Sequence, residues 1–360
     1  MPSTIAYLIL EAIYYKFKRR AISTEYVVVT KPSLQVTPKN KRPYDVVVFG
    51  CTGYTGGLLV DHLAFTYDFK NLESKKLNWA ISGRSVDKLN KVRDKILAKY
   101  SLESLDIIVV DTSKFEQVEQ VVNETKVVIT TVGPYNSLGN EMVNACALYG
   151  TDYVDITGEA DWVQPCISSM QDLAVKSGAR IINFCGNDCI PWDLCTYFMN
   201  KELTEKHDQG LKKIQFYNQF KGAVSGGTIV SSFDIFNMQK DRGFKAKFTH
   251  DKDPWFLYPG EKTSRNITTL DKNSQLPHFD FTAKRLVGKF IMSEVNQRVL
   301  ERTNVLNNYG NIEYGEKVVY LNFMHAYIET ITLLYFACFL LCKPFGCLAK
   351  KFLFPKQGDA

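Results

Sequence analysis

The sequence predicts an α/β protein whose first domain is a doubly wound parallel sheet, and three observations support this fold class. From Tyr44, short β-branched runs alternate with amphipathic segments up to residue 206. The runs lack polar alternation, as strands buried on both faces do. A glycine-rich turn joins the first run to the first amphipathic segment. Together these features are typical of a Rossmann-type sheet with helices on both faces.

The composition indicates a folded, cytosol-facing protein. The chain has 360 residues, 45% of them hydrophobic and 23% charged, which suffices for a sizeable core and two domains. Its net charge of +6 is mild, and Lys and Arg are dispersed among 38 acidic residues, so nucleic acid is not an expected partner. The nine cysteines include no C-x-x-C pair, which favours reduced thiols and no metal site.

Residues 1–43 are predicted to be an N-terminal extension and linker. An apolar run at 4–15 precedes the basic cluster KFKRR and is too short to span a bilayer. It fits a helix at a membrane interface, or a loosely ordered extension without a membrane role. Prolines at 32, 38 and 43 indicate a linker from residue 30.

Residues 44–178 are predicted to form the Rossmann domain. Strands are expected in the runs YDVVVFG, NWAISGR, LDIIVVD, KVVITTVGPY, DYVDITG and, just past the boundary, RIINFCG. Helices are expected over 55–66, 85–100, 112–124, 137–149 and 160–177. Crossovers of this length place helices on the faces of a parallel sheet.

Residues 179–317 are predicted to form a second, mixed α+β domain that binds the substrate. After a helix at 191–206 the β-α repetition ends, and the chain continues with strand-like LKKIQFYNQF and FDFTAKR and helical IMSEVNQRVLERTN. Irregular, aromatic-rich sequence lies between them. A mixed sheet with helices fits this pattern better than a further parallel sheet.

Residues 318–360 are predicted to be an apolar segment that associates with a membrane or with lipid. The part from 318 to 342 contains no Lys or Arg. Three interpretations are open: a bilayer span, a shallow interfacial anchor, and a buried helix pair of the second domain. We favour the interfacial anchor, because lysines 350 and 351 would lie among headgroups.

The turn after the first run is the predicted site for the phosphates of a dinucleotide. Gly50 allows a sharp turn off the strand, Gly53 allows backbone amides to approach a pyrophosphate, and Gly56 allows the helix to pack closely. The start of the helix adds unpaired N–H groups and partial positive charge. The predicted phosphate-binding residues are Gly50, Thr52, Gly53, Tyr54, Thr55 and Gly56.

The end of the second run favours NADP(H) over NAD(H). Arg84 follows Gly83 at the place where a site for NAD offers an acid to the ribose hydroxyls. A guanidinium instead pairs with a 2′-phosphate, so both residues are predicted to contact NADP(H). The alternative is that Arg84 is a solvated charge that pairs with Asp87.

Two further run ends complete the predicted cofactor site. Asp111 is placed either to border the adenine or to cap the helix expected from Thr112. Gly133, Pro134 and Tyr135 end the fourth run and are predicted to line the nicotinamide side of the crevice. All of these residues follow strands whose carboxyl ends meet at one edge of the sheet.

Several motifs resemble those of one enzyme family. They are GCTGYTGG, ISGRS, GPYNSLGNEMVNACALYGTDYVDITGE at 133–159, CGNDCIPWDL at 185–194 and SGGT at 225–228. With them the chain resembles the saccharopine dehydrogenase-like oxidoreductases, which include the trans-acting enoyl reductases of mycobacterial lipid synthesis. The resemblance implies an NADP-binding Rossmann domain, a mixed substrate domain and, in animal members, association with lipid droplets or membranes. CGNDCIPWDL departs from the CGFDSIPSDL type of that family.

The expected function is that of an NADP(H)-dependent oxidoreductase. It would reduce a small-molecule or lipid-like substrate by hydride transfer, at the cytosolic side of a lipid droplet or membrane. The predicted proton donors are Tyr135 and Asp188, and the favoured alternative for Tyr135 is an aromatic ring packed on the cofactor. Two other functions stay open: a catalytically silent NADP-binding scaffold on lipid droplets, and a membrane-bound interaction protein with a vestigial Rossmann fold.

Overall fold

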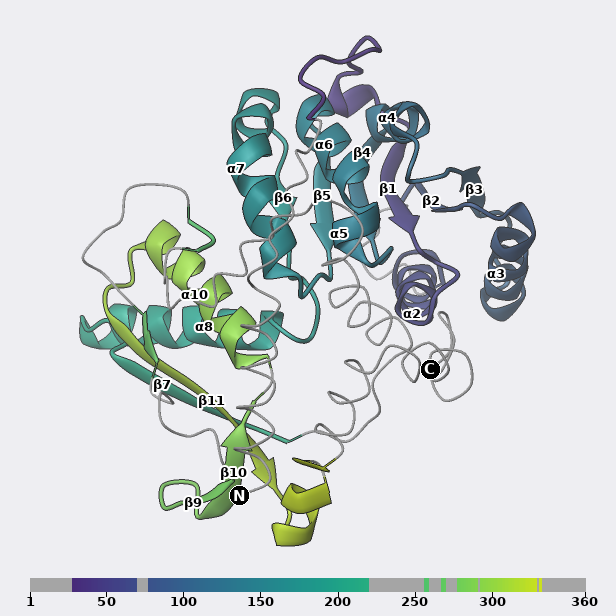
Figure 1. Ribbon diagram of the computed structural model, residues 1–360. Helices are drawn as coiled ribbons and strands as arrows, with labels where there is room; N and C mark the ends of the chain where they lie inside the picture. Colours follow the sequence, from purple (N-terminus) through teal and green to yellow (C-terminus); the bar gives the residue numbers. More distant parts are fainter. Residues whose placement is uncertain are drawn as a thin grey trace, which may run out of the picture. The chain divides into compact units, whose positions relative to one another are not determined.

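The computed structural model describes residues 28–69, 77–219, 256–258, 267–269, 277–290, 292–328 and 330–331 (Figure 1). These residues fall into two compact units, one with the described residues up to Gly186 and the other with those from Asn187 onward. We call them the first unit and the second unit and describe each by itself.

The first unit is built on a six-stranded sheet in which every neighbouring pair of strands is parallel. The strand order is β3-β2-β1-β4-β5-β6, so the winding reverses between β1 and β4. This is the Rossmann-type order, and it confirms the predicted doubly wound sheet. The strands are β1 Tyr44–Phe49, β2 Trp79–Gly83, β3 Asp106–Val109, β4 Thr125–Thr130, β5 Asp152–Asp155 and β6 Ile181–Ile182.

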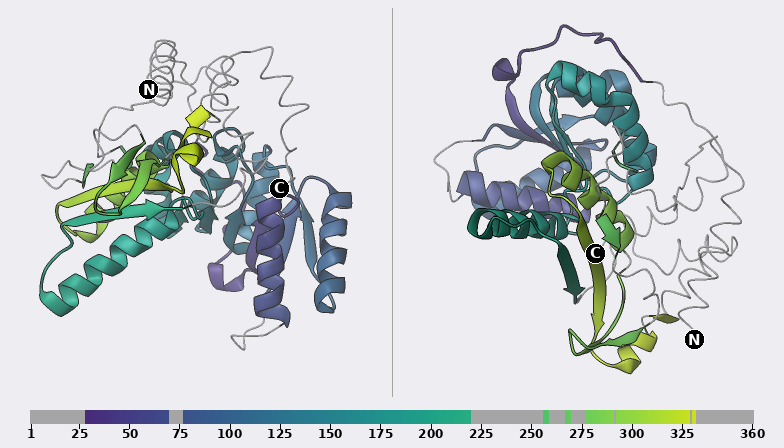
Figure 2. Two further views of the ribbon diagram at one scale, coloured as in Figure 1. Left: turned by 90° about the horizontal axis from the view of Figure 1, so that it is seen from below. Right: turned by 90° about the vertical axis from the view of Figure 1, so that its left-hand side faces the viewer.

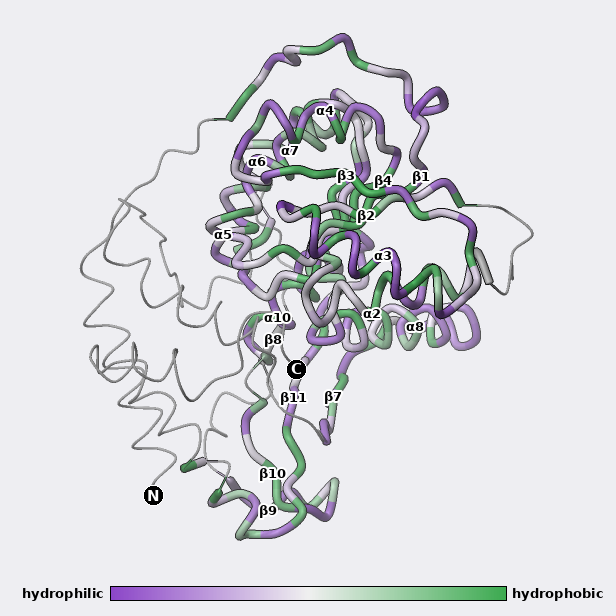
Figure 3. The backbone as a smooth tube through the Cα atoms, turned by 90° about the vertical axis from the view of Figure 1, so that its right-hand side faces the viewer, coloured by the Kyte–Doolittle hydropathy of each residue, from purple (hydrophilic) through white to green (hydrophobic). Residues whose placement is uncertain are grey.

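Helices cover this sheet in two layers. Val47, Val48 and Phe49 are successive residues of β1 without exposed surface, and successive residues point to opposite faces, so both faces are buried. Helix α2 packs against α3, while α4, α6 and α7 pack side by side (Figure 1). In Figure 3 the tube of α3 alternates between hydrophilic and hydrophobic colours, as in an amphipathic surface helix. The helices are α2 Tyr54–Leu63, α3 Val86–Tyr100, α4 Phe115–Asn123, α5 Tyr135–Leu138, α6 Asn140–Tyr149 and α7 Ala160–Ser177.

The described part of the predicted linker is a segment that is hydrogen-bonded to the first unit. We call residues 28–43 the N-terminal strap. The side-chain amide of Asn144 accepts from the backbone N–H of Val29 at 2.8 Å and donates to its carbonyl at 3.0 Å. Asn123 likewise accepts from Thr37 N at 2.8 Å and donates to Gln35 O at 2.9 Å. Two asparagine side chains therefore satisfy the strap backbone much as a neighbouring strand would.

Arg42 fastens the end of the strap to the interior of the first unit. The residue is only 5% exposed. Its guanidinium donates hydrogen bonds to Thr37 O at 3.0 Å, Thr125 O at 2.9 Å, Thr151 Oγ1 at 2.6 Å and Tyr149 O at 2.5 Å. A buried cation needs such partners, because each unsatisfied donor is costly away from water. Arg42 thus joins the strap to β4, to the end of α6 and to the start of β5.

The second unit combines a mixed sheet with two long helices, as predicted for a mixed α+β domain. In the sheet order β7-β11-β10-β9, β11 is parallel to β7 and to β8 but antiparallel to β10. Trp192, Leu300, Ile312 and Tyr314 form its core, so both helices pack on one face of β11 (Figure 2). The elements are α8 Ile190–His207, β7 Lys213–Asn218, β8 Ile267–Thr269, β9 His278–Asp280, β10 Arg285–Lys289, α10 Ser293–Asn307 and β11 Ile312–Tyr320.

The predicted C-terminal segment begins inside this sheet. Residues 318–320 are the end of β11, where Val318 and Val319 pair with β10, so the apolar segment is not separate from the second unit as predicted. A short helix follows at 323–328. The remainder of the predicted segment, from 332 to 360, lies outside the described residues, as do residues 1–27. Among the helices that the structure describes, none has both the length and the apolar character needed to cross a membrane.

Replacing Arg42 tests the role of the strap anchor. Arg42→Met is expected to lower the free energy of unfolding of the first unit by about 3 kcal/mol, because four acceptors lose charge-assisted donors. Urea denaturation monitored by tryptophan fluorescence measures this change. The matched control is Lys41→Met at the exposed neighbouring position, with an expected change below about 0.5 kcal/mol. Equal effects of the two variants would contradict the anchoring role.

Candidate functional site

The carboxyl ends of the central strands bring most of the predicted site residues together in the first unit. The glycine turn at 50–56 follows β1, and β1 lies between β2 and β4 in the sheet. Arg84 follows β2, Asp111 follows β3, and residues 131–135 follow β4. The carboxyl ends of parallel strands meet at one edge of the sheet, so these segments border one region although they are far apart in the sequence.

Two of the three glycines are required by the packing of the protein itself. Gly50 has φ +86°, and a Cβ atom there would lie 2.5 Å from Thr131 Oγ1. At Gly56 a Cβ atom would lie 2.1 Å from the carbonyl oxygen of Gly50. Helix α2 therefore starts directly beneath the turn, and any side chain at either position would push helix and turn apart.

Gly53 is different, because none of the residues that the structure describes crowds it. A Cβ atom at this position would meet only Gly50 O, at the ordinary contact distance of 3.4 Å. The side chains of Thr52, Tyr54 and Thr55 are exposed, so none of them fills the turn. No side chain among the residues that the structure describes caps the first amides of α2. The turn thus keeps the first amides of α2 without a side-chain cap from the described residues, next to a glycine that these residues do not crowd, which is the arrangement of a helix start that can bind an anion.

Cys51 is the one buried side chain of this turn. Its Sγ atom lies 3.7 Å from Ser82 O on β2, and burial raises the pKa of its thiol to about 11. It is therefore a packing residue in the core of the first unit and not a reactive thiol.

Arg84 and Asp111 lie at the ends of neighbouring strands. Val110 N donates to Gly83 O at 3.0 Å, which fixes the two strand ends beside each other. Arg84 is exposed, and within the described part of the chain it has no ion-pair partner, so the structure does not show the alternative pair with Asp87.

The carboxylate of Asp111 is held in a local turn. It accepts hydrogen bonds from Ser113 N at 3.1 Å and from Ser113 Oγ at 2.8 Å. These bonds are the main cause of its lowered pKa, to which the nearby charges of Lys114 and Arg84 also contribute. Helix α4 begins at Phe115, later than expected, so Asp111 shapes the turn before the helix and does not cap it.

Thr131 joins the end of β4 to the glycine turn. Its hydroxyl donates to Phe49 O at 3.2 Å and lies 3.3 Å from Gly50 O. The sequence did not predict this contact, since two positions about eighty residues apart leave no local pattern. Gly133 and Pro134 follow, joined by a cis peptide bond.

The position of Tyr135 argues against its predicted role as a proton donor. The residue is 5% exposed, and its hydroxyl donates to Thr130 O at 3.0 Å. Burial and the nearby charge of Asp155 raise its pKa, which makes the phenol a weak acid. Its ring packs on Trp162 with the centroids 5.6 Å apart. Tyr135 is therefore a structural residue of the β4 end.

Asp155 joins the ends of β5 and β6. Its carboxylate accepts from Thr157 N and Phe184 N, both at 3.1 Å, and from Asn183 Nδ2 at 2.6 Å. Burial raises its pKa to about 6 although these hydrogen bonds favour the charged form. Phe184 has φ +62°, an unusual conformation for an aromatic residue, and the bond from its amide to Asp155 holds it there.

The other predicted proton donor, Asp188, belongs to the second unit. It is an exposed residue just before α8, where partial desolvation raises its pKa. It is not one of the predicted residues that follow the strands β1 to β4 of the first unit. Across the described residues, no cluster of His, Cys, Asp and Glu is arranged to hold a metal ion.

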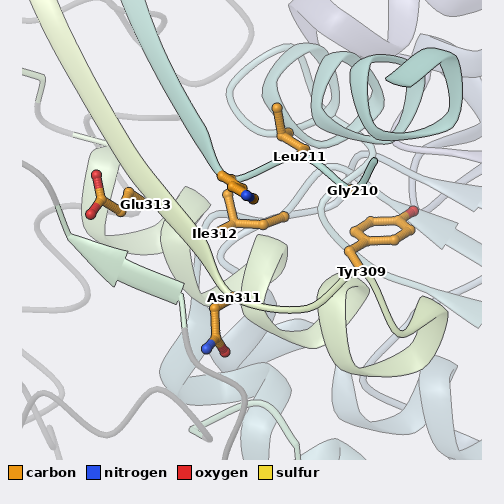
Figure 4. A pocket seen from close by; sticks show the side chains of 7 residues that line it. Gly210, Leu211, Tyr309, Asn311, Ile312 and Glu313 are labelled. Carbon is orange, nitrogen blue, oxygen red and sulfur yellow. The ribbon is translucent and has the colours of Figure 1, made fainter. Parts of the chain in front are cut away.

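The second unit carries an open hollow of about 500 Å³ (Figure 4). Leu211 and Ile312 line it together with Tyr309, Asn311 and Glu313, at the starts of β7 and β11. Its polar groups belong mostly to the sheet edge, where Glu313 N donates to Lys212 O at 2.8 Å. We assign no chemistry to this hollow.

The fold and the glycine turn define the class of protein: an α/β protein with a Rossmann-type unit of the kind that binds dinucleotides. Similarity to known proteins narrows this class. No protein-family model matches the chain. The trans-acting enoyl reductase of Mycobacterium leprae (strain TN) is 31% identical over 298 residues, which cover 78% of this chain and 65% of that enzyme. The trans-acting enoyl reductase of Mycobacterium ulcerans (strain Agy99) is 28% identical over 296 residues, with the same coverage.

The chain is thus a homologue of the trans-acting enoyl reductases, which are oxidoreductases, and the resemblance predicted from the motifs is confirmed. It spans about two thirds of the length of these relatives (65%). Among solved structures, the apo saccharopine dehydrogenase (L-Glu forming) of Saccharomyces cerevisiae matches 49% of this chain and 34% of its own, with a TM-score of 0.36 and 20% identity. The Citrobacter sp. triphenylmethane reductase complexed with NADP(H) matches 55% and 67%, with a TM-score of 0.30 and 13% identity.

The unequal roles of the glycines lead to a testable difference in stability. Gly56→Ala is expected to lower the free energy of unfolding by about 3 kcal/mol, because its Cβ atom would overlap Gly50 O. Gly53→Ala is expected to change it by less than about 1 kcal/mol, since its Cβ atom meets only an ordinary contact. Chemical denaturation of both variants measures the difference. A large loss for Gly53→Ala would show that this glycine serves packing.

Proposed function

We propose that the first unit binds NADP(H) at the carboxyl ends of its central strands, and that the protein is an NADP(H)-dependent reductase acting on a lipid-like substrate. One observation carries the cofactor proposal: no described residue crowds Gly53, and this glycine stands at the start of α2, where no described side chain caps the first amides. Backbone amides at such a helix start bind the pyrophosphate of dinucleotides in folds of this order.

Arg84 supports the choice of NADP(H). Its guanidinium is exposed at the end of β2, and no acid takes the adjacent position at which an NAD site binds the ribose hydroxyls. A planar guanidinium can form two parallel hydrogen bonds with a phosphate. We therefore assign Arg84 to the 2′-phosphate, Gly83 and Asp111 to the adenosine side, and residues 133–135 to the nicotinamide side.

When bound, the cofactor supplies a hydride, and the chain has to hold the reactants and provide a proton. In this proposal the glycine turn, Arg84 and residues 133–135 hold the cofactor. The proton is a separate question, because the acids at this edge of the first unit, Asp111, Asp155 and Glu159, already accept hydrogen bonds from backbone amides. The similarity to proteins named enoyl reductases, and the 13% aromatic content of the chain, support a lipid-like substrate.

The buried hydroxyl of Tyr135 favours one second candidate function, a catalytically silent NADP-binding scaffold. The two functions differ in one measurement. A reductase consumes NADPH in the presence of an α,β-unsaturated acyl thioester, whereas a scaffold binds NADPH and leaves its absorbance unchanged.

The second unit carries an exposed apolar patch that supports our proposal of contact with a lipid droplet or membrane. Phe281 is 85% exposed and Phe323 is 79% exposed. Phe279 pairs with Leu286 across β9 and β10, and Leu286 packs with Ala326 of the short helix, so hairpin and helix adjoin. The apolar patch consists of Phe279, Phe281, Phe323, Met324, Tyr327 and Ile328, and Lys284 and Arg285 are exposed beside it. Aromatic and basic side chains in this mixture suit a phospholipid surface.

Nucleotide selectivity tests the cofactor proposal. NADPH is expected to bind more tightly than NADH, and Arg84→Ala is expected to weaken NADPH about tenfold while leaving NADH unchanged, because only the 2′-phosphate loses its partner. Gly53→Asp is expected to abolish binding of both, since its carboxylate would stand where the pyrophosphate binds. Isothermal titration calorimetry measures these affinities, with Lys91→Ala at an exposed position of α3 as control. Equal affinity of the wild type for NADPH and NADH would refute the selectivity.

Vesicle binding tests the lipid proposal. The double variant Phe281→Ser, Phe323→Ser is expected to reduce binding to phosphatidylserine-containing vesicles at least about tenfold, because two aromatic rings no longer enter the interface. Both side chains are exposed, so the fold should not change. Co-sedimentation measures binding, and Val175→Ser, a 75% exposed position on α7, is the control. Artificial lipid droplets in a parallel assay distinguish a monolayer from a bilayer.

A further inference from the structure

Glu159 bonds to a distant loop and not to its own helix. It lies at the cap position of α7, but its side chain makes no cap hydrogen bond there. Instead Oε1 accepts from Tyr135 N at 3.0 Å and Oε2 accepts from Asn136 N at 2.9 Å. The residue is only 9% exposed. Its two carboxylate oxygens thus hold the two backbone amides at the start of α5.

Trp162, one turn further along α7, holds the same loop. Its ring packs on Tyr135, and its Nε1 donates to Asn140 Oδ1 at 2.7 Å. Gly139 makes this approach possible, because a Cβ atom there would lie 2.6 Å from the ring. The connection from β4 to α6, residues 131–140, is therefore clamped to the start of α7 by two side chains.

Helices α2 and α5 both start at this edge of the sheet, but among the described residues only the amides of α5 are bonded to a side chain. The first amides of α2 receive no side-chain cap from the described residues, whereas those of α5 receive a carboxylate. A carboxylate on these amides uses their donors and repels a phosphate. The phosphates of a dinucleotide are thereby confined to the glycine turn, and the loop at 131–136 is left as a wall for an uncharged part of the ligand.

We propose that Glu159 is a positioning residue for the nicotinamide end of the cofactor. It fixes the loop 131–136 that borders this end and does not itself touch the cofactor. This inference rests on the proposed binding of NADP(H) to the first unit. It predicts that Glu159 affects the nicotinamide half of the ligand and leaves the adenosine half unaffected.

The charge of Glu159 is essential to this role. A carboxylate accepts at both oxygens, so both backbone amides are satisfied. A glutamine accepts at one oxygen only, and its NH₂ group would face the second N–H. Glu159→Gln therefore preserves size but releases one side of the clamp.

The experiment compares two ligands on the full chain. Isothermal titration calorimetry gives the affinities of NADPH and of 2′-phosphoadenosine-5′-diphosphoribose, which lacks the nicotinamide. Glu159→Gln is expected to weaken NADPH about tenfold and to change the second ligand less than about twofold, because only the nicotinamide side is loosened. The enhanced fluorescence of the bound dihydronicotinamide ring is expected to fall in the same variant.

The matched control is Glu119→Gln. Glu119 is also a buried carboxylate of the first unit whose two oxygens accept hydrogen bonds, from Ser33 and Tyr149, but it faces the N-terminal strap. It is expected to alter thermal stability without altering the ratio of the two affinities. If Glu159→Gln does not fold, Trp162→Phe, which keeps the ring contact and loses the bond to Asn140, is expected to show the same selective loss at smaller size.

Two results would overturn the inference, and they can be told apart. If the wild type binds both ligands and Glu159→Gln or Trp162→Phe weakens both equally or neither, the positioning role is wrong while the cofactor proposal stands. If the wild type binds neither ligand, the cofactor proposal fails and the positioning role fails with it.

Discussion

The close approach of α2 to the turn after β1 is the constraint on which the site depends. Gly56 lies beneath the carbonyl of Gly50, and Gly50 lies against Thr131, the residue after β4, so the turn, the helix and the end of the neighbouring strand hold one another in place. The first amides of α2 then have a fixed direction, and the ends of β2, β3 and β4 are arranged around them. A preformed set of donors costs a ligand little ordering entropy.

Buried carboxylates of the first unit mainly fix the main chain. Asp155 holds the loop after β6, Glu159 holds the start of α5, and Glu119 holds the strap. These acids make the borders of the sheet edge rigid, but their oxygens are occupied. Their hydrogen bonds thus shape the loops around the carboxyl ends of the strands.

Local patterns predicted the parallel sheet and its glycine turn, because strands buried on both faces and a strand–glycine–helix junction leave their signature in adjacent residues. Contacts between distant residues left none. The bonds of Arg42 to β4 and β5, and the bonds of Glu159 to Tyr135, link positions that no spacing rule connects. For the same reason Tyr135, which begins α5 after the end of β4, was given a chemical role that its buried hydroxyl does not support. The apolar run from 318 looked independent because sequence alone does not reveal that β10 pairs with its first residues.

The N-terminal strap has a consequence for how this protein can vary. Asn123 and Asn144 bind only its peptide groups, and those groups are the same whatever side chains the strap carries. The bonds from Asn123 and Asn144 therefore place no demand on the side chains of Val29, Gln35 and Thr37, whereas Ser33, which bonds to Glu119, Lys39, which pairs with Asp152, and Arg42 are held through their side chains. Related chains are therefore expected to differ along much of the strap and to keep Asn123 and Asn144, which hold its backbone.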